Sequence, residues 1–165
     1  DFEAAKLLYN SGCRNFGYAP ESGSPRVLDN IKKKVKIPGL ISSLKSSLKA
    51  DLKTHANIIV GFPEETESSV NETLDFCDAA GTGEYGEWVN ISGPKIFTPY
   101  PGTAEFDRAV KNGFVLPSSH VEWGRINRST EDYLDCFPWL NKYSKDTLDR
   151  LAVHFGKGRK TLISH

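Results

Sequence analysis

The chain has 165 residues, of which 38% are apolar, 11% aromatic and 25% charged. This composition is typical of a globular domain and argues against a disordered tail, a collagen or a coiled coil. The 21 Lys and Arg residues balance the 21 Asp and Glu residues, so no excess charge would draw the chain to nucleic acid or to anionic lipid.

The sequence also argues against membrane insertion and secretion. No stretch approaches the roughly 18 consecutive apolar residues that a spanning helix needs. The first residues have neither the basic nor the apolar region of a secretion signal. We therefore expect a cytoplasmic protein without a membrane span. The sequence contains no Met, and because translation begins with Met, we expect the chain to be a piece of a longer protein.

The cysteines predict neither a disulfide framework nor a metal site. Cys13, Cys77 and Cys136 are an odd number and lie far apart in the sequence. Zinc sites and disulfide scaffolds have short, recurring Cys spacings. We therefore expect three free thiols and no metal ligands in this chain.

Hydrophobic periodicity predicts three helices and two strands in the first half of the chain. Apolar residues recur every three or four positions over 2–11, over 25–31 and over 40–52. A short aromatic segment, 14–18, predicts the first strand. The β-branched segment 56–60 is too short for a helix and predicts a buried parallel strand.

The second half of the chain continues the alternation of helices and strands. Three glutamates between residues 64 and 67 suit the first turn of a helix, where carboxylates meet the positive end of the helix dipole. Residues 88–97 predict a third strand, and a helix that ends at Gly113 follows residues 99–103. Strands that alternate with helical crossovers form a parallel sheet, so the sequence predicts the α/β class, with βα repeated about three times.

The last third of the chain predicts a mostly helical C-terminal extension over 114–165, after a first domain over 1–113. The aromatic residues of 114–143 indicate a packed segment, because aromatic side chains usually contribute burial. Ser144 can cap a final helix.

The loops that follow the three predicted strands combine Gly or Pro with polar residues. Ligands of parallel sheets bind at the carboxyl ends of the strands. A Gly lets the backbone approach a ligand, the N–H groups of the next helix suit carboxylate or ribose oxygens, and Glu accepts hydrogen bonds from ammonium or ribose groups. Turn formation alone would also explain these residues, so a non-catalytic ligand-binding or scaffold segment is an alternative.

The same three loops carry a resemblance to a known family. Their motifs are Glu21-Ser22-Gly23-Ser24, Gly61-Phe62-Pro63-Glu64-Glu65-Thr66 and Pro99-Tyr100-Pro101-Gly102-Thr103. In order and spacing they resemble the second half of a radical S-adenosylmethionine (radical SAM) enzyme core, over about residues 1–113. The chain is most similar to the branch whose members often carry a preceding cobalamin-binding domain, and methylthiotransferases share related loops. The resemblance implies the C-terminal portion of a partial (β/α)6 TIM-like barrel.

The resemblance also implies the residues that bind S-adenosylmethionine. Polar groups of the first loop would meet its ribose and amino-acid parts, and the second motif would flank its adenine. The implied cofactor-binding residues are Glu21, Ser22, Gly23, Ile59, Gly61, Phe62, Pro63, Glu65 and Tyr100. Asn57 stands where this family usually has Gly, which affects the contact to the adenine. No catalytic side chain is expected in this chain.

One departure from the family concerns the metal centre. The CxxxCxxC loop that ligates the 4Fe-4S cluster is absent, and the three cysteines present cannot replace it, because the ligands of one cluster converge from a short loop. The resemblance places this loop upstream of Asp1, so we expect the chain alone to be inactive.

In the intact parent, the cluster would reduce bound S-adenosylmethionine to methionine and a 5′-deoxyadenosyl radical, which takes hydrogen from the substrate. An electron donor such as flavodoxin or ferredoxin and a small-molecule or unknown substrate are the expected partners. Cobalamin is a candidate third cofactor of the full-length parent.

One alternative function and several individual residues remain to be considered. An ordinary TIM-barrel lyase fragment is a second alternative. His55 is expected to be a surface or capping residue. The cluster Lys32–Lys34 with Lys36 is expected to be a solvated helix end, because cations suit helix C-termini. Tyr100, between two prolines, is a rigid aromatic that could stack on a substrate.

Overall fold

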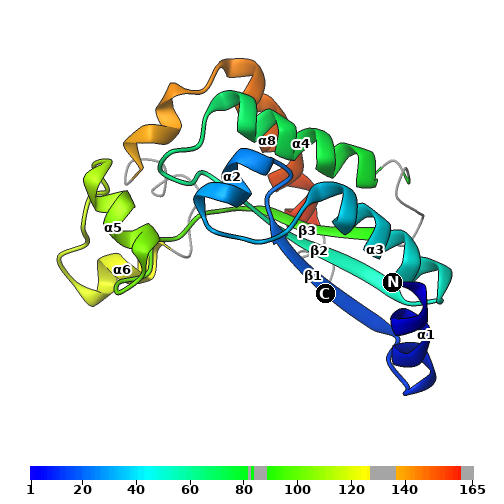
Figure 1. Cartoon of the computed structure of the whole chain (residues 1–165). Coiled ribbons are helices and arrows are strands. Elements are labelled where there is room, and N and C mark those ends of the chain that lie inside the picture. The colour runs from blue at the N-terminus through cyan, green and yellow to red at the C-terminus, as the bar shows by residue number, and fades with distance from the viewer. Residues whose placement is uncertain (82, 84–88, 127–136, 161–165) are drawn as a thin grey trace.

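A three-stranded parallel sheet organises the chain, as Figure 1 shows. The computed structural model describes residues 1–81, 83, 89–126 and 137–160. Strands β1 (Asn15–Glu21), β2 (Lys53–Val60) and β3 (Val89–Ile96) lie in the order β1-β2-β3, and both neighbouring pairs are parallel. The predicted α/β class with three parallel strands is therefore confirmed.

Helices cover one face of this sheet. The two crossovers are formed by α2 (Pro25–Asn30) with α3 (Ile37–Lys49), and by α4 (Glu67–Gly81). Figure 1 shows these helices and α8 (Lys145–Lys160) on the same side of the sheet. The remaining helices are α1 (Phe2–Asn10), near the N-terminal ends of the strands, and α5 (Ala104–Lys111) and α6 (His120–Ile126), beyond their C-terminal ends.

Burial along β2 explains why the helices lie on one side. Thr54, Ala56, Ile58 and Val60 are buried, whereas the residues between them are half-buried. Because successive side chains of a strand point to opposite faces, the buried set faces the helices. Two core clusters follow, one around Leu44, Ile58 and Phe76 and one that contains Val60.

Several predicted boundaries differ from the structure. The first strand continues to Glu21, and the second begins at Lys53, three residues before the predicted start. The helix after β2 begins at Glu67, so Glu64 and Glu65 precede it and are not in its first turn. This last prediction was wrong because the Glu65 carboxylate folds back onto the turn before the helix, as described below.

The C-terminal segment packs into the core of the sheet layer. Phe137, Trp139 and Leu140, at the start of the 3-10 helix Pro138–Lys142, join Val60 and Phe62 in one hydrophobic cluster. The predicted final helix is confirmed as α8, and the Ser144 hydroxyl accepts a hydrogen bond from the Thr147 N–H at its start.

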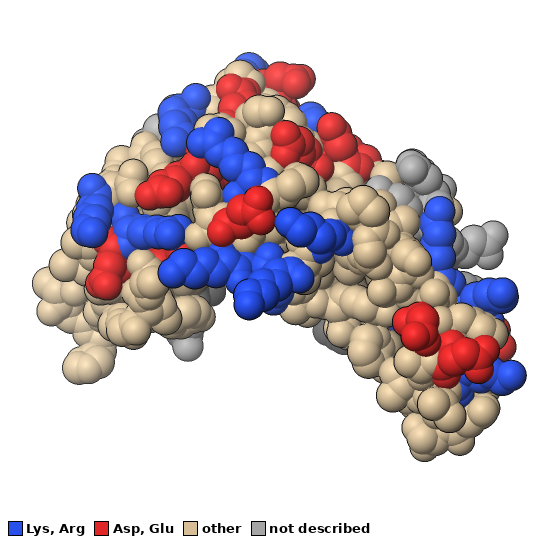
Figure 2. Space-filling view, viewed as in Figure 1, with Lys and Arg blue, Asp and Glu red and all other residues tan. Residues whose placement is uncertain are grey.

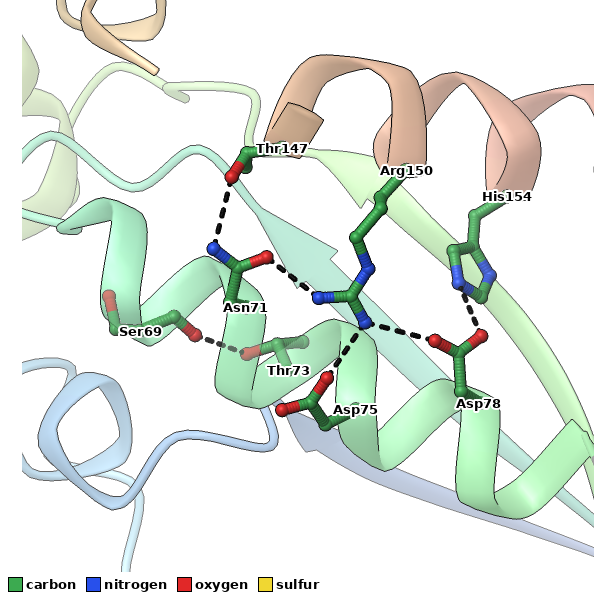
Figure 3. Close-up of polar contacts among 8 residues, drawn as sticks. All are labelled: Ser69, Asn71, Thr73, Asp75, Asp78, Thr147, Arg150 and His154. Atoms are coloured by element: carbon green, nitrogen blue, oxygen red, sulfur yellow. Dashed lines mark hydrogen bonds and ion pairs between the residues drawn. The ribbon is translucent and has the colours of Figure 1, made fainter. Parts of the chain in front are cut away.

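A polar network attaches α8 to α4, as Figure 3 shows. The Arg150 guanidinium donates to Asn71 at 2.8 Å, to Asp75 at 2.7 Å and to Asp78 at 3.0 Å. His154 lies 3.1 Å from Asp78. The two helices therefore contact each other through complementary polar side chains, and both also pack on the sheet.

Among the helices in the described part of the chain, none combines the length and the apolar character needed to cross a bilayer.

Candidate functional site

The parallel register brings the three predicted loops to one edge of the sheet. β2 pairs with β1 on one side and with β3 on the other, and all three strands end at this edge. The loops after them begin with Ser22, Gly61 and Phe97. The structure therefore places the predicted site residues side by side, although their side chains point in different directions.

Glu21 is the last residue of β1 and has a positive φ of 72°. Its Oε1 accepts a hydrogen bond from Lys33 Nζ at 2.9 Å, and both side chains are partly buried. No hydrogen bond to its second carboxylate oxygen is formed by the described residues. Lys33 is therefore not the fully solvated side chain that we expected, since it holds the carboxylate at the strand end.

Ser22 and Gly23 turn away from the edge and pack on α4. The buried Ser22 hydroxyl lies 2.9 Å from the Thr73 hydroxyl, and the Gly23 N–H donates to the same oxygen at 3.3 Å. A Cβ at Gly23 would lie 2.6 Å from the Phe76 Cβ and 3.0 Å from the Thr73 Cα. Only a glycine fits this close approach, which fixes the loop that carries Glu21.

The second loop is held by a buried carboxylate. Gly61 has a φ of 85°, a conformation that glycine adopts without strain. The Glu65 Oε2 accepts hydrogen bonds from the N–H groups of Gly61, at 2.6 Å, and Phe62, at 3.1 Å. Its Oε1 is buried and has no hydrogen-bond partner among the described residues. Glu65 therefore organises this turn from inside the protein.

Burial governs the ionisation of Glu65. Only 2% of the residue is exposed. Desolvation raises the pKa of the carboxyl group to about 7, against the opposing effects of the two backbone hydrogen bonds and the positive charge of Lys142. This carboxyl group therefore gains or loses its proton near neutral pH.

The C-terminal segment completes the same turn. Trp139 Nε1 donates to the Gly61 carbonyl at 2.9 Å, so both backbone polar groups of Gly61 are bonded. The Phe62 ring packs 4.9 Å from the Phe97 ring. Phe62 and Pro63 are buried, whereas Ile59 is half-buried on the sheet face that the helices leave open.

Tyr100 is the most accessible of the predicted site residues. It is 60% exposed in the loop between β3 and α5. Its carbonyl accepts a hydrogen bond from the Thr103 hydroxyl, and Thr103 also caps α5 by accepting from the Phe106 N–H. The loop backbone is thus ordered by the cap, while the aromatic ring projects into solvent.

A small pocket lies on the helix side of this edge, between α2, the second loop and α5. Burial raises the pKa of the Glu105 carboxyl group, and the nearby Arg108 charge opposes this effect. Arg108 also donates to the Asn30 carbonyl at 2.9 Å, which joins α5 to α2. Residues that line the pocket include Val27, Ile31, Phe62, Glu64, Glu65 and Glu105.

Cys13 and Cys77, the cysteines in the described part of the chain, lie in separate places. Cys13 Sγ donates to the Asn15 carbonyl at the start of β1, the end opposite to the three loops. Cys77 is buried in α4, where desolvation raises the pKa of its thiol to about 12. Cys136 lies outside the described residues. No group of three metal-ligating side chains occurs in the part of the chain that the structure describes.

Three side chains that support the site were not identified as such from the sequence. Lys33 binds Glu21, Thr73 holds the Ser22–Gly23 loop, and Trp139 holds Gly61. The last two are about 50 and 78 residues away from their partners in the sequence. No local spacing signals such contacts, although Trp139 could be assigned to a packed segment from its residue type.

Comparison with known proteins gives partial matches. No protein-family model matches the chain. An uncharacterised methyltransferase of Pyrococcus horikoshii is 32% identical over 125 residues, which are 76% of this chain and 26% of that protein. The ribosomal protein uS12 methylthiotransferase RimO of Endomicrobium trichonymphae is 35% identical over 81 residues, covering 46% of this chain and 18% of that protein.

A third match extends over most of the chain. The threonylcarbamoyladenosine tRNA methylthiotransferase MtaB of Thermotoga maritima is 29% identical over 155 residues, which are 91% of this chain and 30% of that protein. The chain spans less than a third of the length of each of these relatives. The similarity is therefore to part of one methyltransferase and two methylthiotransferases.

Proposed function

We propose that this chain is the C-terminal part of the catalytic barrel of a radical SAM enzyme, and that the edge formed by its three loops is part of the wall that binds S-adenosylmethionine. The similarity to a methyltransferase and two methylthiotransferases supports transfer of a methyl or methylthio group as the class of reaction. Because the relatives are much longer, the complete activity belongs to the full-length protein.

The observation that carries this proposal is the ordered convergence of the three loops. Ser22 and Gly23 fix the first loop on α4, and Glu65 fixes the second turn from within. These contacts leave the Glu21 carboxylate and the Ile59 side chain accessible at one edge of a parallel sheet. Ligands of parallel sheets bind at this edge.

The accessible groups fit parts of S-adenosylmethionine. Glu21 has a carboxylate oxygen to which the described residues donate no hydrogen bond, and this oxygen can accept one from an ammonium or ribose hydroxyl group. Ile59 offers a half-buried apolar surface for a planar adenine. When bound and reduced by an iron–sulfur cluster, S-adenosylmethionine supplies radical chemistry that no amino-acid side chain provides.

The buried members of the predicted set would act indirectly. Ser22, Gly23, Phe62, Pro63 and Glu65 are buried, so their proposed role is to position the two loops. Gly61 would contribute backbone, and Tyr100 an exposed ring. The described cysteines do not fit a 4Fe-4S cluster, and the proposal assigns the cluster ligands to another part of the full-length protein.

Further features of the proposal follow the family resemblance. The three strands would be the last half of a (β/α)6 TIM-like barrel over 1–113, with 114–165 as its extension. A flavodoxin or ferredoxin would donate the electron, and cobalamin is a candidate cofactor. We propose a cytoplasmic location for the full-length protein.

The test uses the full-length protein, reconstituted anaerobically with iron and sulfide. We expect an absorption band near 400 nm, roughly where thiolate-ligated iron–sulfur clusters absorb, and formation of 5′-deoxyadenosine from S-adenosylmethionine under reducing conditions. Glu21→Ala should weaken S-adenosylmethionine binding about tenfold, because a hydrogen bond to a charged group is lost. Glu3→Ala, on the exposed surface of α1, is the matched control.

Two results would contradict the proposal. Absence of a cluster and of 5′-deoxyadenosine would favour a scaffold segment or an ordinary lyase barrel. Unchanged affinity in Glu21→Ala would remove this carboxylate from the binding wall while leaving the enzyme class intact.

A further inference from the structure

Glu21 has an unusual backbone conformation for the end of a strand. In the described part of the chain, the other non-glycine residues with a positive φ are Lys32 and Asp51. Each of these two follows the end of a helix, α2 or α3, where this conformation is common. Glu21 instead ends β1, with a φ of 72°. Such a conformation strains a residue other than glycine and persists where surrounding contacts enforce it.

The pairing of β1 with β2 is also irregular at this point. Tyr18 pairs with Ala56, and Glu21 pairs with Ile58, so β1 holds one more residue than β2 between these two pairs. An extra residue in a strand re-aims a side chain, and such irregularities are frequent next to active sites. The regular alternation of the strand therefore does not set the direction of the Glu21 side chain.

The segment between α2 and α3 brings Lys33 to this strand end. Lys32, with its positive φ, reverses the chain after α2, and the Lys33 N–H donates to the Leu28 carbonyl at 2.8 Å. The Lys33 Nζ then donates to Glu21 Oε1 at 2.9 Å. The Lys33 side chain is 34% exposed and the Glu21 side chain 22% exposed. The ion pair therefore lies at the surface of the edge and not in the core.

Lys33 differs from the lysines around it. Figure 2 shows Lys and Arg side chains gathered over the segment that joins α2 and α3 in Figure 1. Lys32, Lys34 and Lys36 are exposed, whereas Lys33 is half-buried. Lys36 lies 3.8 Å from Asp29, and both of these side chains are largely exposed. The neighbouring lysines are thus solvated, while Lys33 has a close and partly enclosed partner.

Folding stability does not account for this arrangement. An ion pair between partly exposed side chains contributes little to stability, and a residue held in a strained conformation costs at least as much. The pair also leaves the Glu21 Oε2 without a hydrogen bond from the described residues, at the carboxyl ends of the strands. Strain that stability does not offset is typical of functional sites.

We propose that Lys33 is a positioning residue of the candidate site, which holds the Glu21 carboxylate in one orientation so that its Oε2 faces the bound ligand. The inference rests on the proposed function, because it takes S-adenosylmethionine as that ligand. A free glutamate side chain rotates about several bonds, and binding a ligand would have to order it. Lys33 does this ordering in advance, and its positive charge compensates the partly buried carboxylate.

The test measures the Kd of S-adenosylmethionine for the anaerobically reconstituted full-length protein by equilibrium dialysis. Lys33→Met removes the ammonium group and keeps a long side chain. We expect it to weaken binding about fivefold, because the ligand must then order the carboxylate. Lys33→Arg keeps the charge and a donor, and should bind within about twofold of the wild type. Lys34→Met is the matched control, since Lys34 is exposed, and should leave the Kd unchanged.

A double-mutant cycle separates positioning of Glu21 from other roles. In the Glu21→Ala background, Lys33→Met should weaken binding no further, because the side chain that Lys33 holds is absent. The midpoint of urea unfolding should be the same in Lys33→Met as in Lys34→Met. In assays of 5′-deoxyadenosine formation, Lys33→Met should raise the KM for S-adenosylmethionine and leave kcat unchanged.

Several results would overturn the positioning role. Unchanged or tighter binding in Lys33→Met would show that the ion pair does not prepare the carboxylate for the ligand. An equal loss of affinity with and without Glu21 would show that Lys33 acts through another group. Binding as weak in Lys33→Arg as in Lys33→Met would exclude the ion pair as the cause, and a lower unfolding midpoint than in Lys34→Met would assign Lys33 to the fold.

The same measurements distinguish this proposal from the proposed function. A wild-type protein that does not bind S-adenosylmethionine would refute the proposed function, and the positioning role with it. A wild-type protein that binds and cleaves S-adenosylmethionine, together with unchanged affinity in Lys33→Met, would refute the positioning role alone.

Discussion

The buried carboxyl group of Glu65 should make the stability of the protein depend on pH. Its pKa is about 7 in the folded chain and 4.5 when unperturbed. Between these values the folded state holds a proton that the unfolded state has released, so stability falls as pH rises. The stabilisation is fully present below pH 4.5 and is lost as pH passes through 7.

The size of this effect follows from the two pKa values. Each pH unit between them lowers the free energy of unfolding by about 1.4 kcal/mol. The total loss between pH 4.5 and pH 7 is therefore about 3 kcal/mol. This is a large part of the stability of a typical domain, which is about 5–15 kcal/mol.

Glu65→Gln removes the titration and keeps the acceptor oxygen for Gly61 and Phe62. Urea unfolding followed by tryptophan fluorescence gives the free energy of unfolding of both forms at several pH values. The difference between wild type and variant isolates Glu65 from the other titrating groups. We expect the variant to gain about 3 kcal/mol relative to the wild type between pH 4.5 and pH 8.

Glu64→Gln is the matched control, because the neighbouring Glu64 is exposed. It should follow the wild-type curve at every pH. A constant difference between wild type and Glu65→Gln across the pH range would show that burial does not penalise the Glu65 charge, and the reasoning would fail.

Three further substitutions, Gly23→Ala, Arg150→Ala and Trp139→Phe, test the contacts around the site and α8 by urea unfolding, and Gly39→Ala and Lys145→Ala are controls for the first two. Gly23→Ala should destabilise the chain by about 1–3 kcal/mol, because its methyl group overpacks the contact with α4. Gly39→Ala, whose methyl group meets open space within a helix, should be neutral or stabilising by up to about 1 kcal/mol. Arg150→Ala should lower the free energy of unfolding by about 1 kcal/mol, and by less at high salt. Lys145→Ala removes an exposed ion pair and should have no measurable effect. Equal losses of stability in the two variants would refute the proposed contribution of the Arg150 network. Trp139→Phe should cost about 1 kcal/mol by removing an indole hydrogen bond, and an unchanged midpoint would show that this bond does not hold the turn.

Periodicity predicted the strands and most of the helices because these elements bury their apolar residues at regular intervals. The prediction failed around Glu65, where a helix-start pattern competes with a tertiary role. The turn at Gly61, which has a positive φ, presents the N–H groups of Gly61 and Phe62 inward. The Glu65 carboxylate accepts from both, so Glu65 is part of the turn and not of the next helix. The alternation of polar and apolar residues along β2 could have shown that His55 faces away from the helices.

Other contacts could not be read from local sequence. Lys33 lies after α2, whereas Glu21 ends β1. The two side chains meet because the chain reverses its direction between them. Thr73 meets Ser22 only because α4 packs against the loop that follows β1 in the assembled fold. Such pairs depend on the assembled layers, so residue spacing contains no signal for them.

The hydrogen bond from Trp139 to the Gly61 carbonyl has a consequence for protein engineering. Exchanging the C-terminal segment between related proteins would replace a structural part of the Gly61 turn. A graft without an equivalent donor would leave this carbonyl unpaired beneath the turn, and would also remove apolar residues from the core that contains Val60 and Phe62. Chimeras that retain residues 137–143 of this chain should therefore preserve the loop more faithfully than chimeras joined after Gly113.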